Sequence, residues 1–434
     1  MDLVSRVEGH EVASNTQFLL NSAYLVFLMQ AGFAMLCAGS VRTKNTKNIL
    51  IKNVLDACVG AIAWFLFGYG FAFGKTEGHT PNSFIGSGNF AMTDVSSPGD
   101  TAFYLFQWAF SAAAATIVSG SVAERTKFIA YLGYSFFLTA FVYPLVVHWG
   151  WSAEGWLGPW RENGPKLFGV GMLDFAGSGI VHMVGGLAGL MGAYMVGPRL
   201  GKYGDDGKPR AIPGHNIGFA VIGVFILWFG WFGFNAGSEL AADNLVPFLA
   251  MNTLLAASAG VIGATAVIWF KTGKADVAMA GNGALAGLVS ITAPVGAVDP
   301  WAAFVIGLIG GLIVVYSVLA FDSIRIDDPV GAISVHGTCG IWGTLSIGLF
   351  AKYDDAFLGR EDAGLFYGGG FEQLIMQLVM VLIVIAWVGI TSYILFAGLK
   401  ATIGLRVDEE EEVAGLDVAE HGSSGYGLEA VGGG

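Results

Sequence analysis

Charged side chains are scarce in this chain. Only 12% of its 434 residues are Asp, Glu, Lys or Arg, against roughly 25% in soluble domains. A chain this poor in charge and 54% hydrophobic is expected to be an integral membrane protein. Nothing in it resembles the basic surface of a nucleic-acid-binding protein, so no nucleic-acid partner is expected.

Cysteine is rare as well, with three in the whole chain. Cys37, Cys58 and Cys339 lie in apolar runs and none belongs to a CxxC pair, so neither a disulfide framework nor a zinc site is predicted. Too few carboxylates and thiolates accompany the histidines for a metal-transport site, and no metal or cofactor is expected. Residues 1-15 contain acidic residues and no basic region leading into an apolar run, which predicts no cleavable signal peptide.

Long apolar runs, in contrast, recur from end to end. Each has about 20 residues, enough to cross a hydrocarbon core of about 30 Å as a helix. Abundant glycine suits such helices, because small residues let backbones pack closely in lipid. Eleven spans are predicted, at approximately 17-39, 50-73, 101-122, 128-147, 175-196, 214-236, 245-270, 276-296, 301-321, 330-350 and 371-403.

The distribution of Lys and Arg predicts the orientation. An odd number of spans places the two ends on opposite sides, and basic residues mark the cytosolic connections. Basic connections alternate with connections that have few basic residues, and the C-terminal segment follows on the basic side. The N-terminus is therefore expected outside the cell and the C-terminus in the cytoplasm, with a transmembrane domain over residues 1-403 and an acidic cytosolic tail over 404-434.

Two midspan histidines share one sequence pattern. His182 and His336 each follow a Val, lie eight residues after an Asp, and have Gly four and seven residues beyond them. Since five spans separate the first span of each half, repeat one (about 17-196) and repeat two (about 214-350) would run with opposite polarity. The predicted fold is an all-α polytopic membrane protein with eleven transmembrane helices, an inverted five-plus-five repeat and one long peripheral helix over about 371-403.

The two histidines are candidate functional residues. An ionisable residue within a membrane helix is costly and indicates function. Equivalent midspan positions of inverted halves meet at the pseudo-two-fold axis, so His182 and His336 are expected to form one buried pair. Burial disfavours a charged imidazole, which predicts a neutral pair sharing one N–H···N bond. The alternative is two separate histidines, each bonded to backbone carbonyls.

Two carboxylates begin the spans that contain the histidines. Asp174 and Asp328 would each lie at a helix N-terminus, where negative charge favours the helix dipole. Capping is the expected role of Asp328. For Asp174, capping and the shaping of an external cation site are both open.

Aromatic residues form short stripes. Phe106 and Phe110 lie four residues apart, and Trp231 and Phe234 lie three apart, so each pair shares a helix face. Such stripes in membrane helices usually serve packing alone.

A tryptophan cluster follows the fourth span. It contains Trp149 and Trp151, and interfacial tryptophan is ordinary. A ring facing a vestibule can nevertheless hold a cation, worth about 0.5 to 2 kcal/mol. Ser238 could supply a hydroxyl acceptor beside it.

Several stretches together resemble the ammonium transporters of the Amt/Mep family. They are Phe106-Gln-Trp-Ala-Phe110, Ala123-Glu-Arg-Thr, Tyr143-Pro144 through His148-Trp-Gly-Trp151, Leu173-Asp-Phe-Ala-Gly, Gly230-Trp-Phe-Gly-Phe-Asn-Ala-Gly-Ser238, Val335-His-Gly-Thr-Cys-Gly and Gly404-Leu-Arg-Val. The resemblance implies a transporter rather than an enzyme, in the plasma membrane, with eleven spans, an outside N-terminus and an inverted repeat. It also implies a homotrimer with one pore per subunit, in contact with the lipid bilayer and with ammonium or ammonia.

The resemblance further implies roles for individual residues. The external recruitment site would consist of Trp151, Ser238 and Phe110, with Asp174 near it and Trp149 as the alternative ring. The pore gate would consist of Phe110, Phe234 and Phe106, and the pore-lining twin histidines would be His182 and His336. The tail resembles the segment that in many members meets a PII-type regulatory protein.

The expected function is transport of ammonium into the cytoplasm. Ammonium would be captured outside and deprotonated, and ammonia would pass the twin histidines, with or without a relayed proton. Potassium ion, which cannot deprotonate, would be rejected. Two alternatives remain: an ammonium sensor or transceptor that signals through its tail, disfavoured because no output domain is recognisable, and a Rhesus-type gas channel, disfavoured by the tryptophan cluster near Ser238.

Overall fold

The computed structural model describes residues 3-75, 82-93, 95, 97-161, 164, 166-353 and 363-426. Over these ranges the regular elements are all helical, and the extended pairings are two isolated bridges, Thr126 with Arg406 and Tyr203 with Pro209. Ten helical segments of at least 18 residues are apolar enough to cross a membrane, and the apolar helix Val277–Thr292 is shorter. These eleven segments correspond to the eleven predicted spans, so the all-α polytopic fold is confirmed.

In the described ranges the helices follow one another with no sheet between them. In chain order they are α1 (Leu3–Ser40), η1 (Thr43–Asn45), α2 (Thr46–Ala63), η2 (Trp64–Gly68), α3 (Tyr69–Phe73), η3 (Phe90–Met92), α4 (Pro98–Ser121), α5 (Phe128–Phe137), η4 (Leu138–Val142), α6 (Tyr143–Trp151), η5 (Leu167–Gly169), η6 (Ser178–Met183), α7 (Val184–Val196), α8 (Ile217–Gly237), α9 (Val246–Thr272), α10 (Val277–Thr292), α11 (Pro300–Ser323), η7 (Ile333–Thr338), α12 (Cys339–Phe350), η8 (Leu365–Tyr367), α13 (Glu372–Thr402), α14 (Glu409–Ala414) and α15 (Leu416–His421).

The first helix differs most from its prediction. α1 begins at Leu3, well before the predicted start near residue 17. Residues 7-14 are helical and exposed. Apolar periodicity marks only the buried part of a helix, so this polar extension leaves no such signal in the sequence.

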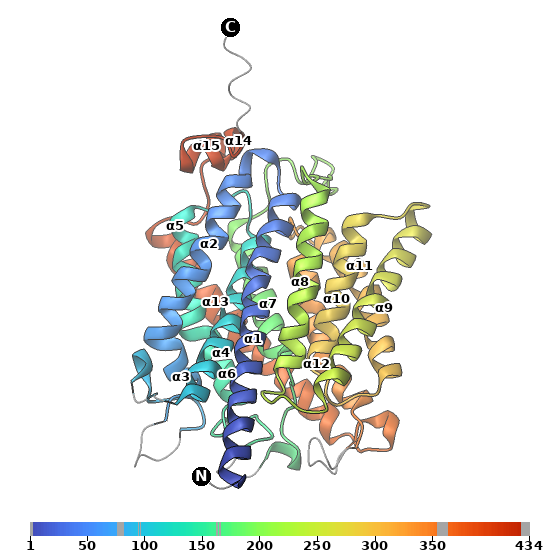
Figure 1. Cartoon of the computed structure of the whole chain (residues 1–434). Coiled ribbons are helices and arrows are strands. Elements are labelled where there is room, and N and C mark those ends of the chain that lie inside the picture. Colours follow the sequence, from blue (N-terminus) through green and yellow to red (C-terminus); the bar gives the residue numbers. More distant parts are fainter. Residues whose placement is uncertain are drawn as a thin grey trace.

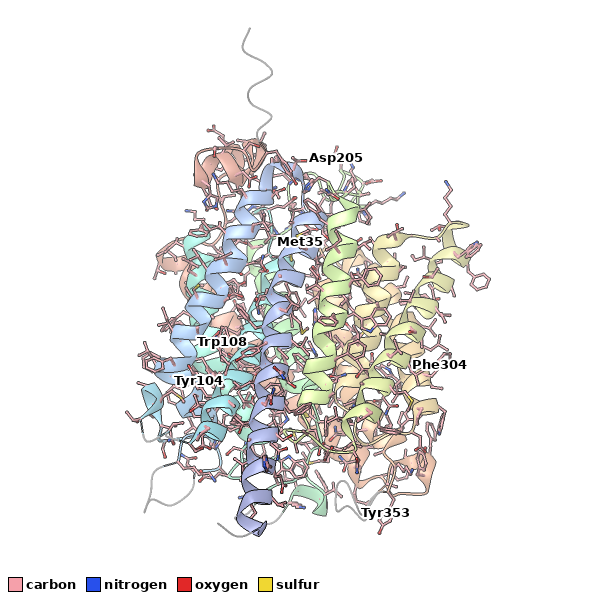
Figure 2. The ribbon with its side chains drawn as sticks, viewed as in Figure 1. Met35, Tyr104, Trp108, Asp205, Phe304 and Tyr353 are labelled. Carbon is pink, nitrogen blue, oxygen red and sulfur yellow. The ribbon has the colours of Figure 1, made fainter. Side chains whose placement is uncertain are left out.

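The two ends of the bundle are distinct. Figure 1 shows the N-terminus at one end and the tail helices α14 and α15 at the other. We call these ends the N-terminal face and the tail face. In Figure 2, Asp205 in the α7–α8 connection lies at the tail face and Tyr353 beyond α12 lies at the N-terminal face. α1 therefore runs toward the tail face and α8 runs away from it, as expected for the first helices of inverted halves.

α1 and α8 pack backbone against backbone along what we call the glycine seam. A Cβ atom added to Gly39 would lie 2.4 Å from the Ala220 nitrogen, and one added to Gly223 would lie 2.3 Å from the Leu36 nitrogen. Only glycine permits this approach, because any Cβ would overlap the opposite helix. Small residues thus join the two halves, as they do in other membrane helix pairs.

The tail is bound to the tail face. Asp417 accepts hydrogen bonds from the backbone N–H groups of Lys47 and Asn48, at 3.0 and 2.8 Å, in the first turn of α2. Lys44 donates to the Glu412 carbonyl at 2.8 Å. Residues 427-434 of the predicted tail lie outside the described residues.

A buried ion network also joins the connections at the tail face. Arg199 bonds Asp327 through Nε at 2.8 Å and Glu124 through Nη1 at 3.2 Å. Arg42 approaches the same Glu124 oxygen at 2.7 Å. Burial would raise the pKa of Asp327, but Arg199 and Arg125 outweigh it and lower the pKa to about 2.

Candidate functional site

Two short π-helical turns begin the spans that contain the histidines. Before η6, both oxygens of Asp174 accept backbone N–H groups, Oδ1 from Gly177 and Ser178 and Oδ2 from Gly179 and Ile180, at 2.8 to 2.9 Å. Asp328 caps η7 in the same manner, with Oδ2 accepting the Ile333 N–H at 2.7 Å. Capping is therefore a role of both carboxylates.

The two spans cross where both backbones carry glycine. A Cβ atom on Gly186 would lie 2.2 Å from the Gly337 nitrogen. This crossing brings the imidazoles together: Nδ1 of His182 lies 3.2 Å from Nδ1 of His336, and the ring centroids are 5.2 Å apart. Both rings are buried, and no hydrogen bond between either ring and a backbone carbonyl occurs among the described residues. Nε2 of His182 has no protein partner in the same part of the chain.

A column of rings leads to this pair. Trp151 meets Phe110 edge to face, with centroids 6.0 Å apart, and Phe110 stacks on Phe234 at 4.0 Å. Phe234 in turn stacks on His182 at 5.2 Å. Phe110, Phe234 and His182 are buried, so the stacked rings lie inside the bundle between Trp151 and the second histidine.

Two further aromatic rings flank the column. Phe106 lies 4.6 Å from Phe110, centroid to centroid. Trp231 stacks on His182 at 4.9 Å, and its Nε1 donates to Thr292 Oγ1 at 2.9 Å. The two aromatic stripes predicted from spacing therefore meet where Phe110 stacks on Phe234. Trp231 contacts His182, and Phe106 contacts Phe110.

A cavity of about 340 Å³ opens on the N-terminal side of the column. Its lining consists of Phe73, Phe103, Phe106, Gln107, Phe110, Trp151, Trp160, Asp174, Phe175, Ser238, Glu239 and Leu240. Trp149 is not part of it, because its Nε1 donates to the Phe84 carbonyl at 2.8 Å and its ring packs against Trp387. Of the two candidate rings, the structure places Trp151 at the cavity.

Ser238, Gln107 and Glu239 bring hydrogen-bond acceptors to this cavity. The Trp151 indole donates to the Asp174 carbonyl at 2.7 Å, which fixes the ring. Ser238 donates its hydroxyl proton to the Phe234 carbonyl at 2.8 Å, so its lone pairs stay available. Gln107 is 5% exposed, and its Oε1 has no partner among the described residues.

Glu239 adds a carboxylate that the sequence reasoning did not single out. It follows Ser238 directly and lines the cavity. Burial, together with the negative charge of nearby Asp243, raises the pKa of Glu239 to about 7. No lysine or arginine forms an ion pair with it in the described part of the chain. The only sequence feature that could have identified Glu239 as a cavity residue is its position directly after the motif that ends at Ser238.

On the other side of the histidines lies a small pocket of about 10 Å³. Phe33, Thr116, Val330 and His336 are among its lining residues. The Phe33 ring lies 6.0 Å from the His336 ring. A volume of this size holds about one water molecule.

The chain is similar to known proteins over nearly its whole length. The model of the Ammonium Transporter Family matches residues 17–426. The ammonium transporter Amt2 of Archaeoglobus fulgidus is 46% identical over 96% of this chain and 89% of its own length. Ammonium transporter 1 member 3 of Solanum lycopersicum is 44% identical over 95% of this chain and 93% of its own.

Solved structures share the fold. A protein described as a sensor Amt protein superposes with a TM-score of 0.86 at 34% identity, covering 95% of this chain and 99% of that chain. Mep2 of Saccharomyces cerevisiae gives a TM-score of 0.82 at 29% identity, over 92% of this chain and 88% of its own. With a family match from residue 17 to residue 426 and relatives above 40% identity along almost all of its length, this chain belongs to the Ammonium Transporter Family.

Proposed function

We propose that this protein recruits ammonium in the cavity beside Trp151, where it loses a proton near the phenyl rings, and conducts ammonia past the histidine pair. The proton either returns to water in the cavity or crosses by a separate relay. The observation that carries the proposal is the column of rings from Trp151 through Phe110 and Phe234 to His182. It joins a cavity of acceptor atoms to a buried neutral pair. The names of the relatives, ammonium transporters in an archaeon and in tomato, support this substrate.

Selectivity follows from what the cavity and the column offer. The Trp151 ring attracts any small cation. Ser238, Gln107 and Glu239 offer acceptors that ammonium can use as a hydrogen-bond donor, whereas potassium ion has no proton to donate. Beyond the cavity the stacked rings of Phe110 and Phe234 exclude water, so only a species that sheds its charge continues.

The histidine pair suits an uncharged solute. One proton fits between the two Nδ1 atoms, so one imidazole donates there and the other accepts. Each neutral ring has a single proton, which leaves one Nε2 as an acceptor and the other as a donor. Ammonia, which both donates and accepts, can use both atoms.

The proposed orientation places the N-terminus outside the plasma membrane and the tail in the cytoplasm. Arg42, Lys44, Arg125 and Arg199 all belong to connections at the tail face, in agreement with the positive-inside rule. We assign residues 1-403 to the membrane domain and 404-434 to the cytosolic tail.

The proposed assembly is a homotrimer with one pore per subunit. Large apolar side chains are exposed on α8 and α11, among them Phe225, Phe229 and Phe304. Figure 2 labels Phe304 on the outside of the bundle. Other subunits and lipid would cover these side chains. A PII-type regulatory protein is proposed to contact the tail face, where α14 and α15 are accessible.

One alternative is supported by a specific observation. The sensor Amt protein has the same fold at 34% identity, so a sensor or transceptor that signals through the tail is the second candidate. Flux separates the two functions, because a sensor needs binding but no transport.

The test is transport by purified protein in liposomes. We expect uptake of labelled methylammonium that ammonium inhibits and potassium does not. The double variant His182→Ala, His336→Ala should lose this selectivity, whereas His10→Ala, at an exposed position of α1, should retain it. Wild-type selectivity in the double variant, or no uptake by the wild-type protein, would contradict the proposal.

A further inference from the structure

α2 buries a carboxyl group near the middle of its span, away from the column of rings. Asp56 is fully buried, and Lys52, one turn earlier, is 2% exposed. Within the described ranges no basic side chain forms an ion pair with Asp56, and Lys52 instead donates to the Thr126 carbonyl at 2.8 Å. Burying an unpaired carboxyl group in a membrane span costs free energy, so its presence there indicates a function.

The contacts of Asp56 fit two protonation states equally well. Its two oxygens contact the hydroxyls of Thr116 and Ser135. Thr116 Oγ1 faces three acceptor atoms at once: an Asp56 oxygen, Gln30 Oε1 at 2.8 Å and the Ala112 carbonyl at 2.9 Å. A hydroxyl has only one proton to donate, so it cannot serve all three.

Either state of the carboxyl resolves this excess of acceptors. If Asp56 is protonated, it donates to Thr116, which donates to Gln30. If Asp56 is ionised, Thr116 donates to it, and Gln30 turns its amide to offer Nε2, which otherwise has no partner in the described part of the chain. Rotation of one hydroxyl and one amide therefore accommodates a proton on Asp56, without any change in the backbone.

Thr116 also connects this group to the transport path. It lines the same small pocket as His336. The pocket has the volume of about one water molecule, enough to bridge two hydrogen-bonding groups. Asp56 is thus one hydroxyl and one water-sized space away from the histidine pair.

Polar groups continue from Asp56 toward the tail face. Tyr131 and Tyr134 on α5 and Ser119 on α4 are buried, and the Tyr131 hydroxyl lies within hydrogen-bond reach of those of Ser119 and Tyr134. The Lys52 ammonium lies 5.7 Å from the centre of the Tyr131 ring. The titratable groups around Asp56 are thus the two tyrosines from α5, Cys37 from α1 and Lys52 on α2 itself.

We propose that Asp56, Thr116 and Gln30 form a proton-holding branch of the path, which accepts the proton lost by ammonium and passes it toward the tail face apart from ammonia. The inference rests on the proposed function. Ammonium yields ammonia and a proton, the proton converts the Asp56 carboxylate into the acid, and release to water at the tail face restores the carboxylate. No oxidant, reductant or further reactant is needed.

The test measures charge moved per solute, with methylammonium flux and current recorded on the same liposome preparations. Asp56→Asn keeps the size of the side chain but cannot gain or lose a proton, and Thr116→Val removes only the connecting hydroxyl. We expect both variants to move about tenfold less charge per methylammonium than the wild type. Thr391→Val is the control, because this half-buried threonine on α13 makes the same bond to the carbonyl four residues earlier.

A spectroscopic readout keeps the test valid if one variant folds poorly. Infrared spectra of the wild-type protein at acid and neutral pH should contain a carboxylic acid band that Asp56→Asn lacks and that Thr116→Val shifts. Wild-type charge per solute in both variants would overturn the inference, as would flux without current in the wild type. No methylammonium flux in the wild type would instead overturn the proposed function.

Discussion

The indole Nε1 of Trp151 donates a hydrogen bond to the backbone carbonyl of Asp174 at 2.7 Å. This bond joins the end of α6 to the segment that caps η6. It holds the ring edge to face against Phe110 and at the cavity. Trp149, two residues earlier, donates to Phe84 and faces away from the cavity. Two neighbouring tryptophans therefore have different surroundings.

We expect Trp151→Leu to raise the KM for methylammonium about two- to thirtyfold, since a cation over an aromatic ring gains about 0.5 to 2 kcal/mol. Trp149→Leu should lower the melting temperature instead and leave KM unchanged. Uptake kinetics and thermal unfolding of both purified variants check this. Equal KM effects in the two would show that the position of the ring does not matter.

The carboxyl group of Glu239 predicts a pH dependence of recruitment. Burial and the charge of Asp243 raise the pKa of Glu239 to about 7, so the group is mostly protonated at pH 6 and ionised at pH 8. The ionised form attracts a cation, and about 1 kcal/mol at the edge of a wet cavity corresponds to about fivefold in KM. KM should therefore fall as pH rises through 7, once corrected for the ammonium fraction of the substrate.

Glu239→Gln should remove this slope and give the higher KM at both pH values. Glu372→Gln, at the start of α13 and outside the cavity lining, is the control and should keep the wild-type slope. A slope that persists in Glu239→Gln would assign the titration to another group.

The ion pair of Asp327 with Arg199 predicts loss of stability in acid. The pKa of Asp327 is about 2 in the folded protein, below the usual value of about 3.9 expected on unfolding. A lowered carboxyl pKa stabilises the fold above pH 4, and this contribution, about 2 to 3 kcal/mol, is lost as pH falls from 4 to 2. Asp327→Asn should therefore melt several degrees lower than the wild type at pH 7 and lose less stability in that acid range.

Thermal unfolding in detergent between pH 2 and pH 7 measures this difference. Asp205→Asn alters an exposed carboxylate at the same face and should follow the wild-type curve (Figure 2). If Asp327→Asn and the wild type lost stability in parallel, the ion pair would not be the source of the acid sensitivity.

The glycine seam predicts a large effect from one added methyl group. Gly223→Ala places its Cβ 2.3 Å from the Leu36 nitrogen, so the helices must separate, at a cost of about 1 to 3 kcal/mol. Gly389→Ala on α13 has no atom within 4 Å of the new Cβ and should be neutral or slightly stabilising. Melting temperatures of the two variants give the comparison, and similar values would contradict close packing at the seam.

Apolar runs and one repeated pattern were sufficient to predict most of the fold. The spans could be predicted because a bilayer demands about 20 apolar residues whatever the tertiary packing. The approach of His182 to His336 followed from the inverted repeat, since symmetry places equivalent midspan residues together. Local sequence did not distinguish Trp149 from Trp151, because the partner that each indole meets belongs to a distant segment.

Isolated polar residues escaped the sequence reasoning. Asp56 is one carboxyl in a long apolar run, and the average hydropathy of the run hides it. Its only sequence signal was Lys52, four residues earlier on the same helix face. Glu239 follows the last residue of a recognised motif, and only the shape of the cavity reveals that its side chain belongs there.

The backbone contact between α1 and α8 has a mechanical consequence. Carriers built from inverted repeats commonly expose their substrate to each side in turn by rocking one half against the other. Here such a tilt would drive the Leu36 and Ala220 backbones into the glycines opposite them. The close contact of these two helices therefore opposes rocking of one half against the other about this seam.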